Sequence, residues 1–557
     1  MIWSDSSQYP YEEGSLFLGL DENNNEVGIK TERHALTIAG AGAGKGAAVI
    51  IPNLLKWPHN ALVIDPKGEA AEATAQTRAD MGQAVHVVDP FGSSRVDDKF
   101  RASYNPLDDL DPDSLTIRED IETIADGIVM RGDAQASHWD DGAQAIISGL
   151  IAYVVSLGVP EICNLITVRQ FLADEDKLAE AMHEMKNLDA CAGLCREAFN
   201  AASAQEGRYF VSNAQKNTRW LDSRGMAKAL ASSSFSLADL KTGRASVYLV
   251  LPANYLGQHG RFLRLFVRCG IEAMARKSPA HDLRGQQCLF LLDEFFSLGY
   301  IDEIAKAAGL MRGYGLQLWP ILQDLGQLIT LYGREGSETF FANADVHQFF
   351  GNTDQLTLEQ ISTRVGVTDL SEIPLPPTPP TAPTSGFYQG IGAVASKSKN
   401  TSTKVLGAAV GGAMSMTQQI AANRAQQRYQ EEMNEYQRDM ARHGRPRVAP
   451  DEVALLVQKK KDVVADNMIC LVYGREPLLI KLAPYFRTGK TVSPEPPRQP
   501  FALTVIMWVF ITLLSSIAGW IAQMVMPVNF NAAIAFGAIG FLYGLWSYLT
   551  RGGVWLE

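Results

Sequence analysis

Short apolar runs alternate with amphipathic stretches in two parts of the chain, residues 1–135 and 236–370. The runs predict buried β-strands, and the stretches with apolar positions three or four residues apart predict helices packed against them. This alternation is typical of an α/β fold with a mostly parallel sheet. The central strands are expected at residues 36–39, 61–65, 288–292, 316–322 and 346–350.

The strand pattern nearly vanishes over residues 136–235, where long amphipathic stretches such as 143–157 and 168–185 replace it. We therefore expect an all-helical domain inserted between the two parts of one sheet domain. Residues 371–404 are rich in proline, glycine and serine, which predicts an extended linker.

Residues 405–498 carry a polar helical pattern at 415–442 and two apolar runs, 468–473 and 478–481. The two runs are expected to return the chain to the sheet. The chain then has a last segment, residues 499–557, of a different character.

Within residues 499–557, two nearly uncharged apolar stretches follow one another, 501–526 and 530–549. Each is long enough to cross a hydrocarbon core of about 30 Å. The three residues between them predict a transmembrane hairpin. Basic residues flank the pair on both sides and none lies in the turn, so both ends are expected to face the cytoplasm.

One loop carries the clearest chemical signal. After the apolar run at 36–39, glycines alternate with alanines before a lysine, and small residues then open a helical pattern. In a phosphate-binding loop, glycines allow backbone N–H groups to surround the phosphate oxygens, while the lysine reaches the β- and γ-phosphates. The candidate nucleotide-binding residues are Gly40, Gly42, Gly44, Lys45 and Gly46.

Two positions depart from the phosphate-loop pattern, which has glycine in place of Ala39 and a magnesium-binding serine or threonine in place of Gly46. A dinucleotide site is an alternative, because residues 42–47 also fit G-x-G-x-x-A and Asp65 ends the next strand at a suitable distance for a ribose hydroxyl. A purely structural turn is the third possibility.

An acidic pair ends the apolar run 288–292 and favours the phosphate-loop interpretation. Asp293 is the expected magnesium ligand, and Glu294 is expected to polarise the attacking water. Gln323 follows the run 316–322 and is a candidate sensor of the γ-phosphate. Arg312 is the one arginine between Glu294 and Gln323. It is the candidate for an arginine donated to the neighbouring subunit, as in ring-shaped NTPases.

With these residues in place, the chain resembles the type IV secretion coupling proteins over roughly residues 15–490. The similarity runs through an ordered set of short segments. They include Gly42-Ala43-Gly44-Lys45-Gly46, Asp65-Pro66-Lys67-Gly68-Glu69, Asp89-Pro90-Phe91, Tyr104-Asn105-Pro106-Leu107, Leu292-Asp293-Glu294-Phe295, Gln323-Asp324-Leu325-Gly326-Gln327 and Gly474-Arg475-Glu476-Pro477 leading to Tyr485.

The resemblance implies a RecA-like P-loop NTPase that uses ATP and Mg²⁺ and assembles as a hexameric ring around a channel. The implied partners are single-stranded DNA or a relaxase–DNA complex, secreted proteins, components of the secretion channel and the bacterial inner membrane. Coupling proteins usually carry their membrane helices at the N-terminus, so a C-terminal hairpin departs from the family pattern. The bulk of the chain is expected in the cytoplasm.

Composition limits the class of protein further. The formal net charge of −11 argues against a general nucleic-acid coat, which would need a broad basic surface. The six cysteines lack the paired spacing of a metal site and are expected to be reduced thiols.

The sequence thus predicts a membrane-anchored hexameric ATPase that drives nucleoprotein into a type IV secretion apparatus. One alternative is a DNA-pumping ATPase of the segregation or packaging type. Another is a degenerate ATPase that serves as a membrane docking receptor, a hypothesis that Ala39 and Gly46 motivate.

Overall fold

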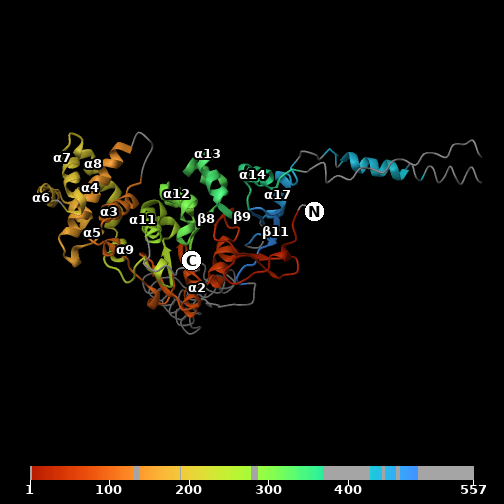
Figure 1. Ribbon diagram of the computed structural model, residues 1–557, viewed down its shortest axis with the longest axis horizontal. Helices are drawn as coiled ribbons and strands as arrows, with labels where there is room; N and C mark the ends of the chain where they lie inside the picture. Colours follow the sequence, from red (N-terminus) through yellow and green to blue (C-terminus); the bar gives the residue numbers. More distant parts are fainter. Residues whose placement is uncertain are drawn as a thin grey trace, which may run out of the picture. The chain divides into compact units, whose positions relative to one another are not determined.

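The computed structural model describes residues 3–130, 137–188, 190–276, 287–367, 424, 427–438, 440–441, 446–458 and 464–486. All of these belong to one compact unit, Met1–Lys490. Its centre is an eleven-stranded sheet in the order β2-β1-β11-β10-β9-β3-β8-β7-β4-β6-β5 (Figure 1). The strands are β1 (Leu16–Leu20), β2 (Glu26–Ile29), β3 (His34–Ala39), β4 (Asn60–Asp65), β5 (Ala84–Val88), β6 (Ala245–Val250), β7 (Cys288–Leu292), β8 (Leu316–Leu322), β9 (Ala344–Phe350), β10 (Asn467–Val472) and β11 (Leu478–Lys481).

The sheet is parallel from β9 through β3, β8, β7, β4 and β6 to β5. It is antiparallel from β9 through β10, β11 and β1 to β2. The predicted central strands are confirmed as β3, β4, β7, β8 and β9, and the predicted return of the chain is confirmed as β10 and β11. Strand β8 lies between β3 and β7. The loop after β3 and the acids after β7 therefore lie at the same edge of the sheet, two strands apart.

Alternate residues of each strand point to opposite faces of the sheet, and helices pack against both faces. On one side, Ala61 and Val63 of β4 pack with η2 (Gly46–Ile50), α1 (Ile51–Lys56) and α2 (Glu69–Asp80). On the other side, helix α11 (Leu256–Ala275) provides much of the cover.

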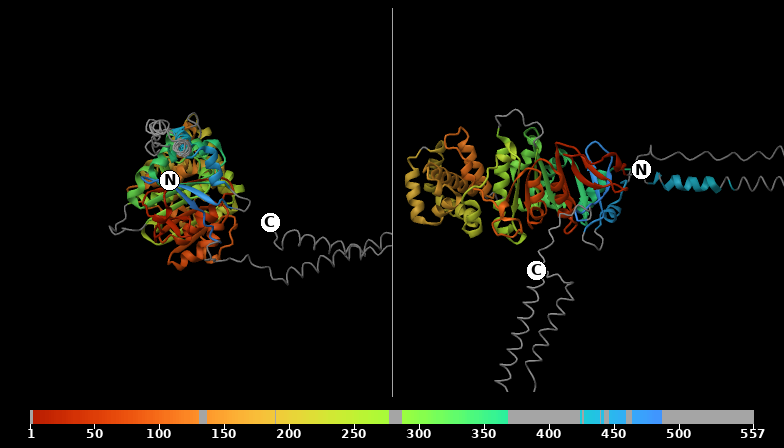
Figure 2. Two further views of the ribbon diagram at one scale, coloured as in Figure 1. Left: turned by 90° about the vertical axis from the view of Figure 1, so that its right-hand side faces the viewer. Right: turned by 90° about the horizontal axis from the view of Figure 1, so that it is seen from below.

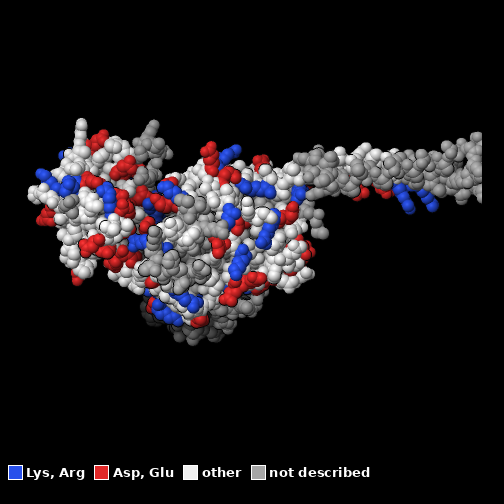
Figure 3. Space-filling model, in the orientation of Figure 1, with Lys and Arg blue, Asp and Glu red and all other residues white. Residues whose placement is uncertain are grey.

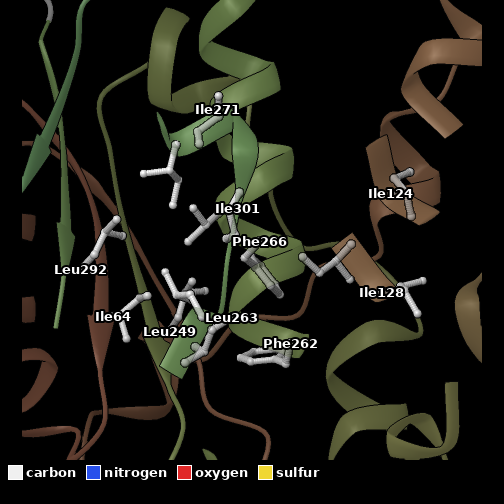
Figure 4. Close-up of a cluster of buried hydrophobic side chains, with 14 of the residues drawn as sticks. Ile64, Ile124, Ile128, Leu249, Phe262, Leu263, Phe266, Ile271, Leu292 and Ile301 are labelled. Atoms are coloured by element: carbon white, nitrogen blue, oxygen red, sulfur yellow. The ribbon is translucent and has the colours of Figure 1, made fainter. Parts of the chain in front are cut away.

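Figure 4 shows how α11 joins the sheet to the helical part of the chain. Ile64, Leu249 and Leu292 of three neighbouring strands lie on the sheet side of α11, and Leu263 of that helix is fully buried in the same cluster. Ile124 of α3 (Ile117–Ile128) lies across α11 from the sheet. The cluster thus extends the core of the sheet into the helices without a break.

The described chain between β5 and β6 is helical. It contains α3, α4 (Ser137–Ser156), α5 (Leu165–Ala173), α6 (Glu175–Met185), α7 (Leu194–Ser203), α8 (Gly207–Thr218), α9 (Arg224–Leu230) and α10 (Asp239–Thr242). Helix α4 packs against α7 and α8, and Figure 2 shows this group in orange and yellow beside the sheet. The domain boundaries at residues 136 and 235 stay predictions.

One expected helical stretch is interrupted. Residues 168–185 were predicted as one continuous pattern, yet α5 ends at Ala173 and α6 begins at Glu175. Asp174 has extended backbone angles, and its side chain accepts hydrogen bonds from the amides of Asp176 and Lys177. This N-cap satisfies the first amides of α6 and starts a new helix there.

Further helices of the described chain are α12 (Asp302–Leu310), α13 (Leu325–Asn343), α14 (Gln355–Val365) and α17 (Pro450–Val457). Of the helix expected at 415–442, the described part includes a helical segment at 427–438. The predicted linker at 371–404 and the predicted hairpin within 499–557 lie outside the described residues. Among the residues that are described, no helix is long and apolar enough to cross a membrane.

Candidate nucleotide site

The loop after β3 has the backbone shape that its glycines predict. Gly42 and Gly44 adopt positive φ angles of 66° and 96°, a region that favours glycine. The helical segment η2 begins directly afterwards at Gly46 and continues into α1. Amides at a helix start, together with the positive end of the helix dipole, favour a bound phosphate. The loop is therefore built to receive an anion between β3 and η2.

Gly40 has a different position from the other loop glycines. Its N–H donates to the carbonyl of Phe350 at 3.1 Å, and a Cβ at this position would lie 1.9 Å from the carbonyl oxygen of Gly351. The close approach of β9 therefore explains the glycine. Ala39 is buried within β3, so no turn glycine is required at that position.

A pocket of about 580 Å³ opens over the loop. It draws residues from the ends of several strands and from the segment after β11. Its lining is Ala41, Gly42, Ala43, Gly44, Lys45, Gly46, Ala47, Ile50, Ile51, Ile64, Asp65, Pro66, Lys67, Glu69, Ala70, Asp293, Glu294, Gln323, Val464, Tyr485 and Phe486.

The predicted site residues that line this pocket are Gly42, Gly44, Lys45, Gly46, Asp293, Glu294 and Gln323. Gly40 and Arg312 are the two that the structure does not bring to it. Three separate segments of the chain thus converge on one cavity at the carboxyl edge of the parallel strands, where ligands bind in open α/β sheets.

The acidic pair follows β7 directly. Glu294 has φ 50° and ψ 42°, a left-handed conformation that is uncommon for a residue with a side chain and occurs often at functional sites. Asp293 Oδ1 is buried and has no hydrogen-bond partner among the described residues. Burial raises the pKa of Asp293 to about 6, against the lowering effect of the Lys45 ammonium. An unsatisfied carboxylate oxygen beside a phosphate-binding loop fits a hydrated Mg²⁺.

Glu294 is held from two sides. Gln323 donates from Nε2 to both of its carboxylate oxygens at 3.2 Å, and Lys45 Nζ lies 4.0 Å from Oε1. The backbone amide of Gln323 donates in turn to Oε1 of Gln327 at 2.9 Å, which fixes the start of α13 beside the pocket. Gln323 follows β8, the strand beside β7, which explains its contact with Glu294.

Arg312 lies in η10 (Met311–Tyr314), just before β8 begins at Leu316. Gln323 follows the other end of the same strand. At about 3.3 Å per residue, the length of β8 separates the two by roughly 20 Å. The structure therefore places the backbone of Arg312 at the opposite edge of the sheet from this chain's own pocket.

Sequence reasoning did not place two further parts of the pocket. Asp65 ends β4 with 5 % exposure, and burial raises its pKa to about 7, with the nearby Asp293 carboxylate adding to the rise. Tyr485 and Phe486 come from beyond β11, where the Tyr485 amide donates to the carbonyl of Ala47 at 2.9 Å. The sequence signals were the acid at a strand end and the tyrosine of the family pattern, neither of which specifies a pocket.

The fold and the pocket define a RecA-like P-loop architecture. The family model for type IV secretory system conjugative DNA transfer matches residues 7–371. The chain therefore belongs to the type IV secretion conjugative DNA-transfer family, which confirms the resemblance seen in the sequence. Membership favours the phosphate-loop interpretation over the dinucleotide alternative.

Among curated relatives, the chain is 30 % identical over 354 residues to the conjugal transfer protein TraG of Rhizobium radiobacter, covering 60 % of this chain and 52 % of the relative. It is 30 % identical over 338 residues to protein VirD4 of Agrobacterium fabrum (strain C58 / ATCC 33970), covering 60 % and 49 %. The chain thus spans about half the length of the curated relatives it matches.

Solved structures show the same fold. The plasmid coupling protein TrwB in complex with ADP and Mg²⁺ matches with a TM-score of 0.55 at 13 % identity, covering 86 % of this chain and 91 % of that one. TrwB in complex with the non-hydrolysable GTP analogue GDPNP matches with a TM-score of 0.53 at 13 % identity, covering 81 % and 86 %. At this identity the likeness concerns the fold.

Proposed function

We propose that this protein is an ATPase that couples ATP hydrolysis to the delivery of DNA or nucleoprotein into a type IV secretion apparatus. The observation that carries the proposal is the convergence of Lys45, Asp293, Glu294 and Gln323 on one pocket. Family membership supports the transport role, and the names of the relatives TraG and VirD4 point to conjugal transfer or type IV secretion.

Each pocket residue has a role in this proposal. The amides of Gly42, Gly44 and Gly46 and the ammonium of Lys45 bind the phosphates of ATP. Asp293 would hold Mg²⁺, which would supply positive charge to neutralise the phosphate oxygens.

Glu294 accepts a proton from the attacking water, and Gln323 keeps the glutamate oriented. Lys45 Nζ lies 4.0 Å from Oε1 of Glu294, so a γ-phosphate bound by this lysine would lie beside an oriented carboxylate. This arrangement is suited to in-line attack by water on that phosphate.

A ring of subunits would complete the site. The backbone of Arg312 lies one strand length from its own pocket, too far for an arginine side chain to reach. We therefore propose that Arg312 acts in trans on the neighbouring subunit of a homohexamer. The proposed partners are single-stranded DNA or a relaxase–DNA complex, secreted protein and components of the secretion channel.

Surface charge bears on where DNA is contacted. Figure 3 shows acidic and basic side chains interspersed over the described surface in that view. Together with the formal net charge of −11, this distribution disfavours DNA binding by a broad basic face. We therefore propose that DNA contacts the protein in a narrow channel of the assembled ring.

We also propose that residues 499–557, which lie outside the described residues, anchor the protein in the membrane. Deleting residues 501–557 should release a protein that still binds ATP, since the described strands of the sheet all precede residue 482. A tag after Glu557 should be protected from external protease in intact spheroplasts. Persistence of the truncated protein in the membrane fraction, or cleavage of the tag from outside, would contradict the hairpin.

One observation keeps a second function in view. Gly46 offers no hydroxyl for magnesium. This absence is consistent with an ATPase that has lost turnover and serves as a docking receptor for secretion substrates. Measured ATP turnover with and without single-stranded DNA separates the two. A motor should hydrolyse ATP and respond to DNA, whereas a receptor should bind substrate without turnover in either condition.

A further inference from the structure

The metal side of the proposed site lacks a ligand that phosphate-binding loops provide. In such loops, a serine or threonine hydroxyl after the lysine binds Mg²⁺. This chain has Gly46 there, and a Cβ built on Gly46 meets no atom within 4 Å. A different oxygen of the pocket has to compensate if the ion is to be held as firmly.

Asp65 is a buried carboxylate of the same pocket. Ile64 of β4 and Leu292 of β7 are partners in a parallel pair, so Asp65 and Asp293 follow at matching positions on the same edge of the sheet. Both line the nucleotide pocket. Asp65 is 5 % exposed, and Asp293 Oδ1 is buried without a hydrogen-bond partner among the described residues. Adjacent carboxylates with an unsatisfied oxygen suit a hard divalent cation.

We propose that Asp65 and Asp293 together hold the hydrated Mg²⁺ of the bound nucleotide, with Asp65 compensating for the hydroxyl absent at Gly46. This inference rests on the proposed ATP site. The other basic side chain of the pocket besides Lys45 is that of Lys67, which is 73 % exposed and therefore screens the buried carboxylates weakly.

A structural role for Asp65 is the competing explanation. Its Oδ2 accepts a hydrogen bond from the Ala71 amide at 2.8 Å, in the first turn of α2, and the backbone amides of Lys67 and Gly68 also stabilise its carboxylate. Asparagine in its place keeps an oxygen that can accept this bond but removes the charge. Asp65→Asn therefore separates metal binding from support of the helix start.

The test measures binding of a ribose-labelled fluorescent ATP analogue, first in EDTA and then as Mg²⁺ is added. The proteins are the full chain, Asp65→Asn, Gly46→Ser and the double variant. Asp89→Asn is the control, because Asp89 also follows a strand, has a side chain that is 1 % exposed and lies outside the pocket. Its carboxylate accepts hydrogen bonds from the hydroxyls of Ser93 and Ser94 and lies 3.5 Å from Arg101 Nη1. Mn²⁺ binding in the presence of ADP, followed by electron paramagnetic resonance, gives a second readout.

In EDTA, Asp65→Asn should bind the analogue as well as the full chain or more tightly, because a negative charge beside the phosphates is removed. It should need about tenfold more Mg²⁺ or Mn²⁺ for half-saturation, the loss typical of groups that support a metal. Gly46→Ser should restore most of this loss in the double variant, and Asp89→Asn should match the full chain.

Three results would overturn the inference. They are an unchanged Mg²⁺ requirement in Asp65→Asn, no recovery in the double variant, or weaker binding in EDTA, which would indicate the structural role. If Asp65→Asn does not fold, Gly46→Ser alone decides. If the Mg²⁺ concentration that Gly46→Ser needs for half-saturation changes by less than about twofold, the inference is supported, because Asp65 already supplies the ligand. If that concentration falls about tenfold, the inference is contradicted. Absence of nucleotide binding by the full chain even with Mg²⁺ would instead refute the proposed ATP site.

Discussion

The amide nitrogen of the Gln323 side chain donates to both carboxylate oxygens of Glu294 at 3.2 Å. The two residues follow neighbouring parallel strands, β8 and β7, so the register of the sheet sets their separation. Glu294 also has a left-handed backbone, which a hydrogen-bonded side chain helps to maintain. Gln323 therefore acts on the proposed chemistry by orienting the glutamate.

Replacing Gln323 with alanine should lower the turnover number for ATP by about a hundredfold, the size of effect expected when a reacting group is misplaced by about 1 Å. Nucleotide affinity should change little, because Gln323 holds Glu294 rather than the phosphates. Steady-state kinetics together with analogue binding give both quantities. Gln355→Ala is the control, since Gln355 makes a similar amide–carboxylate contact with Glu359 on the exposed face of α14. Equal losses in both variants would remove the positioning role.

Arg312→Ala subunits mixed with Glu294→Gln subunits should recover ATPase activity that neither variant shows alone. Some interfaces of a mixed ring then pair an intact arginine with an intact glutamate. An arginine finger contributes about 10³-fold or more in rate, so partial recovery is measurable. Activity is followed across mixing ratios, with mass spectrometry to verify that rings are mixed. No recovery in verified mixed rings argues against action in trans.

Gly40→Ala should destabilise the fold, because its Cβ would lie 1.9 Å from the Gly351 carbonyl oxygen and force β3 and β9 apart. Overpacking of this kind costs about 1–3 kcal/mol in the free energy of unfolding. Gly46→Ala is the matched control, since the corresponding Cβ meets no atom within 4 Å. Denaturant unfolding measures both. Equal stability of the two variants would show that the contact with Gly351 is unimportant.

His347 should make the protein acid-sensitive. Burial lowers its pKa from 6.5 to about 4, so the unfolded chain binds more protons than the native one between these values. Stability that is present above pH 6.5 is therefore lost as the pH falls toward 4, by an amount on the order of 3 kcal/mol.

Comparing the wild-type chain with His347→Gln isolates this contribution to the pH dependence. The free energy of unfolding, measured from pH 7 to pH 4, should fall less steeply in the variant because glutamine does not titrate. Parallel pH profiles for the two proteins would contradict the assignment of this loss to His347.

The sequence predicted the central strands well because each is an apolar run bounded by polar or turn residues, as at 288–292 and 316–322. The phosphate-binding loop could also be predicted, because its residues are neighbours in the sequence. The interruption at Asp174 was missed, because one capping side chain ended a pattern that remained amphipathic on both sides.

Features that depend on contacts between distant parts of the chain could not be predicted from local sequence patterns. The place of Asp65 in the pocket depends on the register of β4 with β7, which no single segment encodes. The pairing of Leu20 with Lys481, which joins the first strands to the last, likewise depends on how the whole chain closes. The separation of Arg312 from its own pocket follows from the direction of β8 in the assembled sheet.

The assignment of the loop after β3 to ATP is best tested by measuring ATP turnover of the wild-type protein and of Lys45→Ala. The nearest carboxylate that pairs with the Lys45 ammonium is 4.0 Å away, so the substitution should leave the unfolding midpoint nearly unchanged. We expect DNA-responsive hydrolysis by the wild type and loss of turnover in a folded Lys45→Ala protein. Hydrolysis by the variant at the wild-type rate would contradict the assignment of this loop to ATP.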